Sequence, residues 1–525
     1  MEMSVFMAFV LACVTGFAYL GRRFLGDMFL ERPVFLAPVV GFIMGDLQTG
    51  LVVGGTLELI FMGAASYGGS VPANVAVGST IGTAFAITSG ATPEEALVIA
   101  VPAAMLGAFL EMFAKSACVF CVTFAEKYAD EADTRGISRM LHIGNLFHFL
   151  SFAIPTFIAL ALGADYVGTM VAGIPPWLNS GVQVAGKILP ALGFGILLST
   201  LSSKVYMPFF FIGFLFAAYT SFGVLGIAVL AILVSMVIMN LSRDEDEDEE
   251  FDEETAAAPV SISKKDQWRF IFRGCAIQSA FSFDRMQAIG FTWTLIPYLK
   301  EIYKDNKDGL REALKRHLSF FNVMPWMVGP VVAVTANMEA RKARGEDIDG
   351  HAIQGVKSGL MGPLAGIGDS LFIGTFRPIL GGICAGLAFQ GLYLAPIIFV
   401  VVANVVHFYV RYITLVKGIE LGERAFTALT SSGFRKIMQG ATITGLMAVG
   451  ALVGTWLNVK TPLAMTIRDA TIKLQSSLDS IMPKLLPLCI TLCVYYMIRK
   501  GVKNTNIMLI LTVAGLILGA FGILG

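Results

Sequence analysis

Long apolar runs separated by short polar stretches make up most of this chain. Four runs are nearly free of charge and approach the length of about 20 residues that a bilayer-spanning helix needs: Ser4–Leu20, Gly223–Asn240, Gly391–Val410 and Thr505–Gly525. No small-residue cleavage site and polar mature region follow the first run, so we interpret it as a retained helix and not as a secretory signal. The pattern predicts an all-α polytopic membrane protein.

Glycine interrupts the apolar pattern in two places. Residues 33–88 contain GFIMGDLQTGLVVGG and a further glycine-rich stretch, and residues 359–372 read GLMGPLAGIGDSLF. Irregular backbone at membrane depth survives only inside protein or beside a watery cavity, so we expect re-entrant or broken helices in both. In the second stretch we expect a hairpin bend, in which Pro363 ends one half-helix and Asp369 caps the next.

Charge divides the chain. The composition is 56% hydrophobic and 14% charged, against about 25% charged in a typical soluble domain. Ten carboxylates lie between Asp244 and Glu254, which leaves 38 − 10 = 28 acids against 38 bases elsewhere. The acidic run predicts a disordered linker at 243–265 between two membrane modules, 1–242 and 266–525.

The excess of bases outside the linker places the basic loops in the cytoplasm and both termini outside. Residues 308–321, DGLREALKRHLSFF, predict a basic amphipathic helix with Asp308 as its N-cap. This helix and the polar stretch 338–357 are either a docking site for a cytoplasmic partner or ordinary positive-inside loops.

The candidate functional residues suit a path for a solute and not a catalytic centre. No phosphate-cradling motif and no metal-spaced His/Cys cluster occurs, and seven scattered cysteines within apolar segments argue against disulfides. We expect no catalytic residue on this chain, no metal, no cofactor and no nucleic-acid partner. Its status as an enzyme is therefore left open.

Ionisable and amide side chains in apolar, glycine-rich surroundings are the candidate ligands, because such groups are costly at membrane depth. They are Glu58, Asn74, Gln278, Asp369 and Arg377. Carboxylates and amides bind pairs of sugar hydroxyls, and broken helices add free backbone groups at mid-membrane. For Asp369, a salt bridge to Arg377 or the helix cap rivals a ligand role. Asp46, in GDLQTG, is interpreted as a structural turn residue.

Two long motif sets carry a family resemblance. RPVFLAPVVGFIMGDLQTGLVVGGTLELIFMG in the first module resembles the IIC component of the mannose-type phosphoenolpyruvate-dependent sugar phosphotransferase system (PTS). SFDRMQAIGF, RHLSFFNVMPWMVGP and GVKSGLMGPLAGIGDSLFIGTFRPI in the second resemble its IID component. Together the resemblances cover almost the whole chain outside the linker, as in a fusion of two usually separate subunits.

The resemblance implies a multi-pass permease of the bacterial inner membrane with two pseudo-symmetric modules. It also implies an elevator-type movement, a homotrimer and cytoplasmic IIA and IIB partners, of which IIB phosphorylates the incoming hexose. Carried over by position, Glu58 and Gln278 become sugar ligands, joined by Asn74, Ser66 and Asp369. Where mannose-like members are expected to carry an acid after proline, this chain reads Pro72, Ala73, Asn74, which argues against mannose itself. The segment SGVQVAGKILPALGFGILL resembles the galactosamine-like branch, so the expected substrate is a hexose or an amino or N-acetylated hexose.

Two other classes of protein fit the same composition. An ion-coupled secondary sugar transporter would use Glu58 or Asp369 for a proton and would need no soluble partners. A membrane receptor would bind a ligand without transporting it. Solute flux, and its dependence on phosphoenolpyruvate, distinguishes the three.

Overall fold

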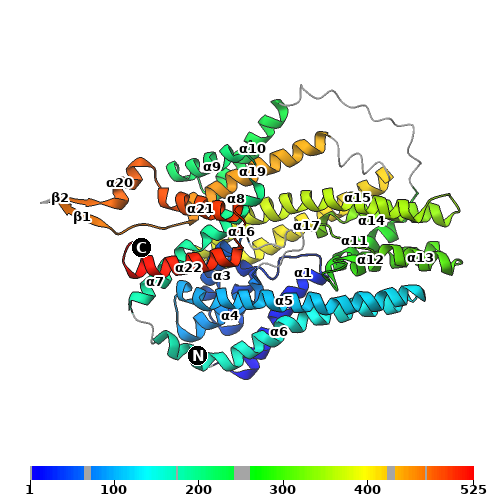
Figure 1. Ribbon diagram of the computed structural model, residues 1–525, viewed down its shortest axis with the longest axis horizontal. Coiled ribbons are helices and arrows are strands. Elements are labelled where there is room, and N and C mark those ends of the chain that lie inside the picture. The colour runs from blue at the N-terminus through cyan, green and yellow to red at the C-terminus, as the bar shows by residue number, and fades with distance from the viewer. Residues whose placement is uncertain (1–2, 64–72, 173–175, 242–259, 423–431, 468–469) are drawn as a thin grey trace.

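The chain forms an elongated bundle whose helices run mostly along its long axis (Figure 1). The computed structural model describes residues 3–63, 73–172, 176–241, 260–422, 432–467 and 470–525. In the first half the helices are α1 (Val5–Phe24), α2 (Pro33–Met44), α3 (Leu47–Ile60), α4 (Val75–Ser89), α5 (Pro93–Asp130), α6 (Thr134–Ala172), α7 (Pro176–Ile188), α8 (Pro190–Leu201), α9 (Met207–Tyr219) and α10 (Val224–Leu241).

The second half is also helical apart from one small hairpin. Its elements are α11 (Lys264–Gly274), η3 (Cys275–Gln278), α12 (Ala288–Ile302), α13 (Lys307–His317), η4 (Pro325–Met327), α14 (Gly329–Ala343), α15 (Gly350–Gly368), η5 (Asp369–Phe376), α16 (Arg377–Phe389), α17 (Ala395–Leu421), α19 (Ser432–Trp456), β1 (Ala464–Ile467), β2 (Ala470–Lys473), α20 (Leu474–Ile481), α21 (Leu485–Arg499) and α22 (Asn504–Ala520). Strands β1 and β2 pair antiparallel, with Ala464 opposite Lys473.

The polytopic membrane fold is confirmed. Within the described residues, six helices are long and apolar enough to cross a membrane, and a seventh span is possible if α20 and α21, bent by 76°, count as one. The four charge-free runs of the sequence correspond to α1, α10, α17 and α22. All seven cysteines are free, as expected.

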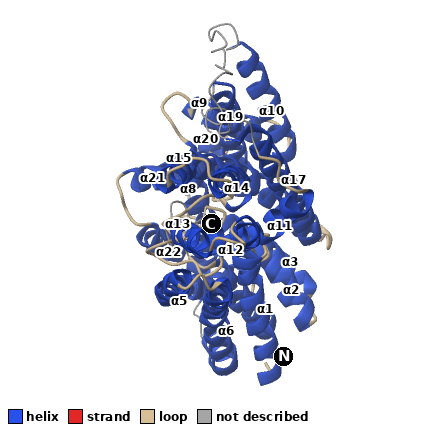
Figure 2. Cartoon of the chain, turned by 90° about the vertical axis from the view of Figure 1, so that its right-hand side faces the viewer, coloured by secondary structure: helices blue, strands red, loops and turns tan. Residues whose placement is uncertain are grey.

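The two halves of the chain are intertwined. Helices α9 and α10 of the first half pack on α19 of the second, while α22 and α21 pack back on α7 and α8. Figure 2 looks along the long axis and shows α5 and α6 on one side, α9, α10 and α19 on the opposite side, and α14, α15 and α17 between them. The protein is therefore one body built from both modules.

Short helices replace full spans in the glycine-rich part of the first module. Helices α2 and α3 have 12 and 14 residues, or about 18–21 Å at 1.5 Å per residue, which is less than the roughly 30 Å of a hydrocarbon core. They turn at Gly45, with φ of 85°, and Asp46, whose carboxylate caps α3 at Thr49 N. Gly41 and Gly50 let the two backbones touch, because a Cβ on Gly41 would lie 2.9 Å from the Cα of Gly50. Broken helices are thus confirmed here, with Asp46 in a structural role.

The predicted hairpin bend in the second module is wrong. Residues 350–389 form one 40-residue helix in which α15 passes through the π-helical η5 into α16. Pro363 lies inside α15, and Asp369 has helical φ and ψ of −63° and −43°, so it caps no helix start. A membrane helix tolerates an internal proline when neighbouring groups or a local change of helix type satisfy the freed backbone groups. The π-helical turn at Asp369 is such a change, and turns of this kind are frequent at functional sites.

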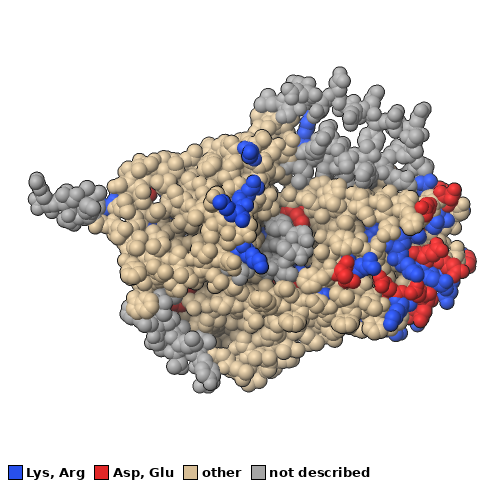
Figure 3. All heavy atoms as spheres, in the orientation of Figure 1, with Lys and Arg blue, Asp and Glu red and all other residues tan. Residues whose placement is uncertain are grey.

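Charged side chains gather at one end of the long axis (Figure 3). This end carries α13, whose N-cap is Asn306 and not the predicted Asp308. Both chain termini lie toward the opposite end (Figure 1), the arrangement expected if the charged end faces the cytoplasm. That orientation stays a prediction.

Most of the predicted linker, 243–265, lies outside the described residues. Its last residues, 260–265, are described: Val260 and Ile262 are buried in the core, and α11 begins at Lys264. Within the described residues, the packed core therefore includes Val260 and Ile262 from the stretch assigned to the linker.

Candidate functional site

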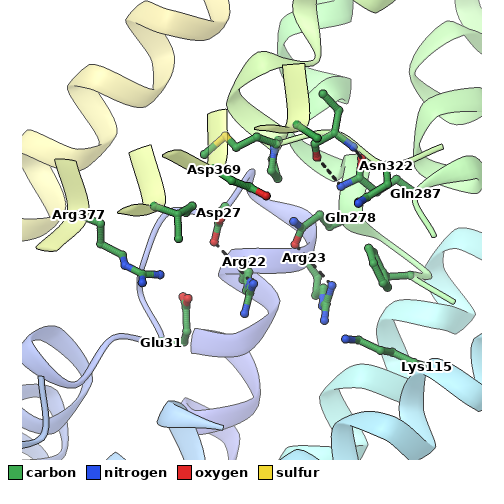
Figure 4. A pocket seen from close by; sticks show the side chains of 16 residues that line it. Arg22, Arg23, Asp27, Glu31, Lys115, Gln278, Gln287, Asn322, Asp369 and Arg377 are labelled. Carbon is green, nitrogen blue, oxygen red and sulfur yellow. Dashed lines mark hydrogen bonds and ion pairs between the residues drawn. The ribbon is translucent and has the colours of Figure 1, made fainter. Parts of the chain in front are cut away.

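A polar cavity lies where the two modules meet (Figure 4). Its volume is about 50 Å³, less than the roughly 300–1,000 Å³ of a typical small-molecule site, so a sugar would enter only if the surrounding elements move apart. The end of α1, the connector 25–32 and α5 line it from the first module. The loop after η3, residues 322–325 and the helix through η5 line it from the second. A molecule in this cavity would touch both halves of the chain.

The connector between α1 and α2 brings two carboxylates to the cavity. Its backbone is left-handed at Gly26 (φ 94°), Asp27 (φ 68°) and Phe29 (φ 60°), a conformation that costs energy for residues other than glycine. Two hydrogen bonds to its carbonyls hold it: the indole of Trp326 donates to Asp27 O at 3.4 Å, and the amide of Asn404 donates to Met28 O at 3.2 Å. The second module thus fixes the course of this connector.

The acidic groups facing the cavity are poorly satisfied by the protein. Asp27 has only a long ion pair, 3.7 Å from Arg22 Nε. Glu31 is buried, and its Oε2 has no hydrogen-bond partner among the described residues; the same holds for Arg22 Nε. Asp369 forms no hydrogen bond or ion pair of its side chain in the described part of the chain. Because buried polar groups normally find partners, unfilled ones around a cavity indicate a ligand site.

On the first module's side, a charge cluster borders the cavity. Glu111 Oε1 accepts from Arg23 at 3.0 Å and from Lys115 at 3.1 Å, and its Oε2 accepts from the amide of Asn74 at 3.4 Å. Arg23 also donates across the module boundary to Gln278 Oε1, at 3.5 Å. We call Arg23, Glu111 and Lys115 the α1–α5 cluster. Glu111 is the shared partner of both cations, which leaves the cluster with one net positive charge at the cavity wall, and Arg23 holds Gln278.

Apolar groups complete the wall. The ring of Phe281 lies under both cations of the α1–α5 cluster, 5.0 Å from Arg23 and 5.2 Å from Lys115. Gln287 fixes the backbone of Val323 with two hydrogen bonds, donating to its carbonyl at 2.8 Å and accepting from its N–H at 3.0 Å. The cavity therefore combines charged hydrogen-bonding groups with a fixed apolar surface, as a sugar ring requires.

The five predicted sugar ligands differ in where they lie relative to this cavity. Gln278 and Asp369 line this cavity. Asn74 lines a smaller adjoining cavity, which shares Arg22, Glu31 and Arg377 with the first. Ser66 lies outside the described residues, and Glu58 lines neither cavity.

Glu58 has a protein partner that its neighbours in sequence did not suggest. Arg32, just before α2, donates to Glu58 Oε1 through Nε at 3.0 Å and through Nη2. The N–H of Val34 donates to the other oxygen at 3.3 Å. Both side chains are almost fully buried. Glu58 thus holds Arg32, which lines the adjoining cavity.

Sequence reasoning missed several cavity residues. In the sequence, Arg22 and Arg23 are only two basic residues that follow the first apolar run. Asp27 and Glu31 follow in a short connector that gave no periodic signal. Glu111 and its partner Lys115, four residues apart inside an apolar helix, carried the signal of intramembrane charge that singled out Glu58. Arg377 was singled out, and its Nη2 donates to Met62 O at 2.9 Å.

The described residues contain no group of three or more His, Cys, Asp or Glu side chains that could hold a metal ion. A Cys–His pair occurs: the Cys118 thiol lies 3.7 Å from His148 Nε2 in the packed interface of α5 and α6. Both side chains are fully buried there. These residues pack the core.

Comparison with known proteins places both halves of the chain. The family model for the PTS mannose/fructose/sorbose family IID component matches residues 261–524, and the model for the PTS sorbose-specific IIC component matches residues 3–237. The "PTS system mannose-specific EIID component" of Escherichia coli (strain K12) is 36% identical over 270 residues, which are 50% of this chain and 95% of that protein.

The first half has its own relatives. The "Fructose permease IIC component" of Bacillus subtilis (strain 168) is 29% identical over 242 residues, 46% of this chain and 88% of that protein. A solved structure of the mannose transporter ManYZ in complex with microcin E492 contains a chain that is 35% identical, matched over 99% of its length and 50% of this chain, with a TM-score of 0.31.

Proposed function

Because this chain belongs to the mannose/fructose/sorbose family of the sugar phosphotransferase system, as IIC and IID permease components in one polypeptide, we propose that its inter-module cavity binds the transported sugar. The chain is a multi-pass protein of the bacterial inner membrane, and its system supplies cytoplasmic IIA and IIB partners. IIB would phosphorylate the sugar when it reaches the inner face. No catalytic residue of this chain is required for that step.

The observation that carries the proposal is the set of unfilled polar groups around one cavity. Asp27, Glu31 and Asp369 can accept hydrogen bonds from hydroxyls, and Arg22 can donate to a hydroxyl or ring oxygen. Gln278, engaged by the protein only through a long contact of 3.5 Å to Arg23, can do both. Such groups bind an uncharged polyol more strongly than water does when they are already oriented, because no reorganisation is needed.

The substrate we propose is a hexose or an amino or N-acetylated hexose. Three carboxylates with incomplete pairing suit a ligand rich in hydrogen-bond donors, which includes hydroxyls and an amino or acetamido N–H. Asn74 at the adjoining cavity offers an amide, in a stretch where mannose-like members are expected to carry an acid after proline. Competition binding among mannose, galactosamine and N-acetylgalactosamine would rank these classes.

For transport we propose an elevator-type movement, in which a transport core of the protein moves against a scaffold. The family resemblance implies this movement. Bonds that join the two modules, such as Arg377 Nη2 to Met62 O at 2.9 Å and Arg23 to Gln278 Oε1 at 3.5 Å, would either break during the movement or lie within one moving body. We also propose the homotrimer that the family resemblance implies, to be tested by mass measurement in detergent.

Uptake in reconstituted vesicles tests the function. We expect sugar accumulation as its phosphate, dependent on phosphoenolpyruvate and the soluble components including IIB, and insensitive to a proton gradient. Accumulation of free sugar that follows the proton gradient without these components would instead identify an ion-coupled transporter. Binding without any flux would identify a receptor.

Docking of IIB can be tested at the charged end. Helix α13 exposes Lys307 and Lys315 and half-buries Arg311; Arg311 pairs with Asp308 at 3.0 Å and Lys315 with Asp130 on α5. We propose that this face contacts IIB. Charge reversal at Lys307 should weaken IIB-dependent phosphorylation without changing sugar affinity, and an unchanged phosphorylation rate would exclude this face.

A further inference from the structure

We propose that α11 forms a binding site for anionic phospholipid at the cytoplasmic surface of the membrane. The site consists of Lys264, Lys265, Trp268 and Phe272 on α11 with Tyr412 on α17, and we call it the α11 lipid site. It takes the phosphate-bearing headgroup of an anionic lipid at the lysines and the upper acyl chain at the aromatic rings. The assignment of this side to the cytoplasm rests on the orientation used in the proposed function.

One face of α11 is exposed, and its side chains change along the helix from charged to aromatic. Lys264, Lys265, Trp268 and Phe272 are spaced so that they share a helix face, and all four are exposed. Trp268 retains 51% and Phe272 63% of its side-chain surface. An exposed tryptophan and phenylalanine beside two lysines would be costly in water. The same gradient suits the boundary between hydrocarbon and headgroups.

Helix α17 repeats the gradient beside it. Its exposed face runs from Val401 and Val405 to Tyr409 and Tyr412, and one turn further along the helix, on a different face, exposed Lys417 pairs with Glu420. The ring of Trp268 lies 5.9 Å from that of Tyr412 and 5.8 Å from that of Phe272. Two helices that pack together thus place aromatic rings at one level, with lysines beyond them. Tyrosine and tryptophan at such a level mark the membrane–water interface.

The lysines are available and held in place. No carboxylate among the described residues pairs with Lys264 or Lys265. The helix beneath them is firmly anchored: Ser263 caps it, with its hydroxyl 2.6 Å from the carboxylate of buried Asp266, and Arg273 donates to Trp293 O at 2.9 Å. A lipid headgroup bound here would therefore meet two cations on a rigid element.

The opposite flank of the molecule provides a matched control. Lys500 and Lys503 are exposed between α21 and α22, which lie across the bundle from α11 and α17 (Figure 2). A double substitution there removes the same two charges without touching the α11 lipid site.

Brominated lipids, which quench tryptophan fluorescence on contact, test the proposal. The full-length protein is reconstituted in phosphatidylcholine vesicles that contain either brominated phosphatidylglycerol or brominated phosphatidylcholine. The fluorescence lost in W268F assigns the signal of Trp268. We expect phosphatidylglycerol to quench Trp268 in preference to phosphatidylcholine, and this preference to fall as salt rises.

The lysine variants decide the role of charge. Lysines near an anionic surface contribute a preference of about fivefold each, so K264Q/K265Q should lower the selectivity by up to about thirtyfold. Quenching by phosphatidylcholine should remain, and K500Q/K503Q should behave as wild type. Equal quenching by both lipids in the wild type, or unchanged selectivity in K264Q/K265Q, would overturn the proposal. No quenching by either lipid would also overturn it, since it would mean that protein covers this face.

Discussion

The substitution E58Q separates a structural from a ligand role for Glu58. In the folded protein the Arg32 and Glu58 side chains are 2% and 1% exposed, and Arg32 Nη2 also donates to Phe61 O at 3.1 Å. Removing one partner of a buried pair costs about 3–5 kcal/mol, because the other charge is left uncompensated. We expect the low end, about 3 kcal/mol, since the glutamine oxygen and the Phe61 carbonyl remain as acceptors for Arg32.

The assay compares four proteins: wild type, E58Q, R32Q and R32Q/E58Q. The free energy of unfolding is measured in mixed micelles with increasing dodecyl sulfate, and sugar affinity by calorimetry. If the pair is structural, the double variant removes both charges and should recover at least half of the stability lost in E58Q. Its sugar affinity should recover with it, because neither Glu58 nor Arg32 lines the inter-module cavity.

Two results would refute this reasoning. The first is that E58Q keeps a stability within about 1 kcal/mol of wild type, well below the expected loss, and yet loses sugar binding; Glu58 would then be a sugar ligand in a conformation that differs from this one. The second is that the double variant regains its stability without regaining affinity; Glu58 or Arg32, which lines the adjoining cavity, would then contact the sugar.

Three further substitutions probe the cavity and the charged end. D369N should weaken sugar binding at least tenfold and leave the free energy of unfolding unchanged, because hydrogen bonds to charged groups contribute about 1.5–3 kcal/mol. D308N, on the exposed surface, is the control. Equal sugar affinities of D369N and wild type would exclude Asp369 as a sugar ligand. E111Q should destabilise the protein by about 3 kcal/mol, because it leaves two buried cations without their carboxylate partner. Adding K115M should restore part of this stability in the same micelle assay. No recovery would show that the loss of stability does not come from the unpaired cations. At the charged end, burial acts to raise the pKa of Glu339, but its bonds to His317 and Arg316 outweigh burial and lower the pKa to about 2 from 4.5. Because the folded-state pKa of Glu339 is lowered, its ionisation stabilises the protein above about pH 4.5, and this contribution of about 3 kcal/mol is lost as the pH falls toward 2. R316Q should make the loss of stability in acid smaller. An equal acid sensitivity in R316Q would refute the assignment.

Local rules predicted the elements that depend on neighbours in sequence. Charge-free runs identified α1, α10, α17 and α22, and the glycines of residues 33–60 identified the short α2–α3 hairpin. Asp46 was correctly given a structural role because an N-cap needs only the residues that follow it. The continuous helix through Asp369 was missed, since the effect of Pro363 depends on packing partners from elsewhere in the chain.

The cavity itself could be predicted only in part, because its residues meet through tertiary structure. Gln278 and Arg23 are separated by 255 positions yet lie within 3.5 Å. The connector that carries Asp27 and Glu31 owes its shape to Trp326 and Asn404 of the other module. A polar residue in apolar sequence signals that it needs a partner, but not whether that partner is protein or ligand.

The hydrogen bonds of each buried carboxylate show whether its partner is protein, which the sequence could not do. Buried charge in this protein falls into two kinds. In one kind every carboxylate oxygen is engaged by the protein, as at Glu58 and Glu111. In the other kind, acceptor positions stay unfilled beside the cavity: buried Glu31 has an oxygen without a hydrogen-bond partner among the described residues, and half-buried Asp369 has no side-chain bond to them. A saturated carboxylate can bind sugar only by giving up a buried cation, which costs several kcal/mol, whereas an unsaturated one gains by binding. Since a transport site must also release its cargo, the ligands are to be sought among the unsaturated groups, whose bonds to sugar replace bonds to water and not bonds that hold the fold.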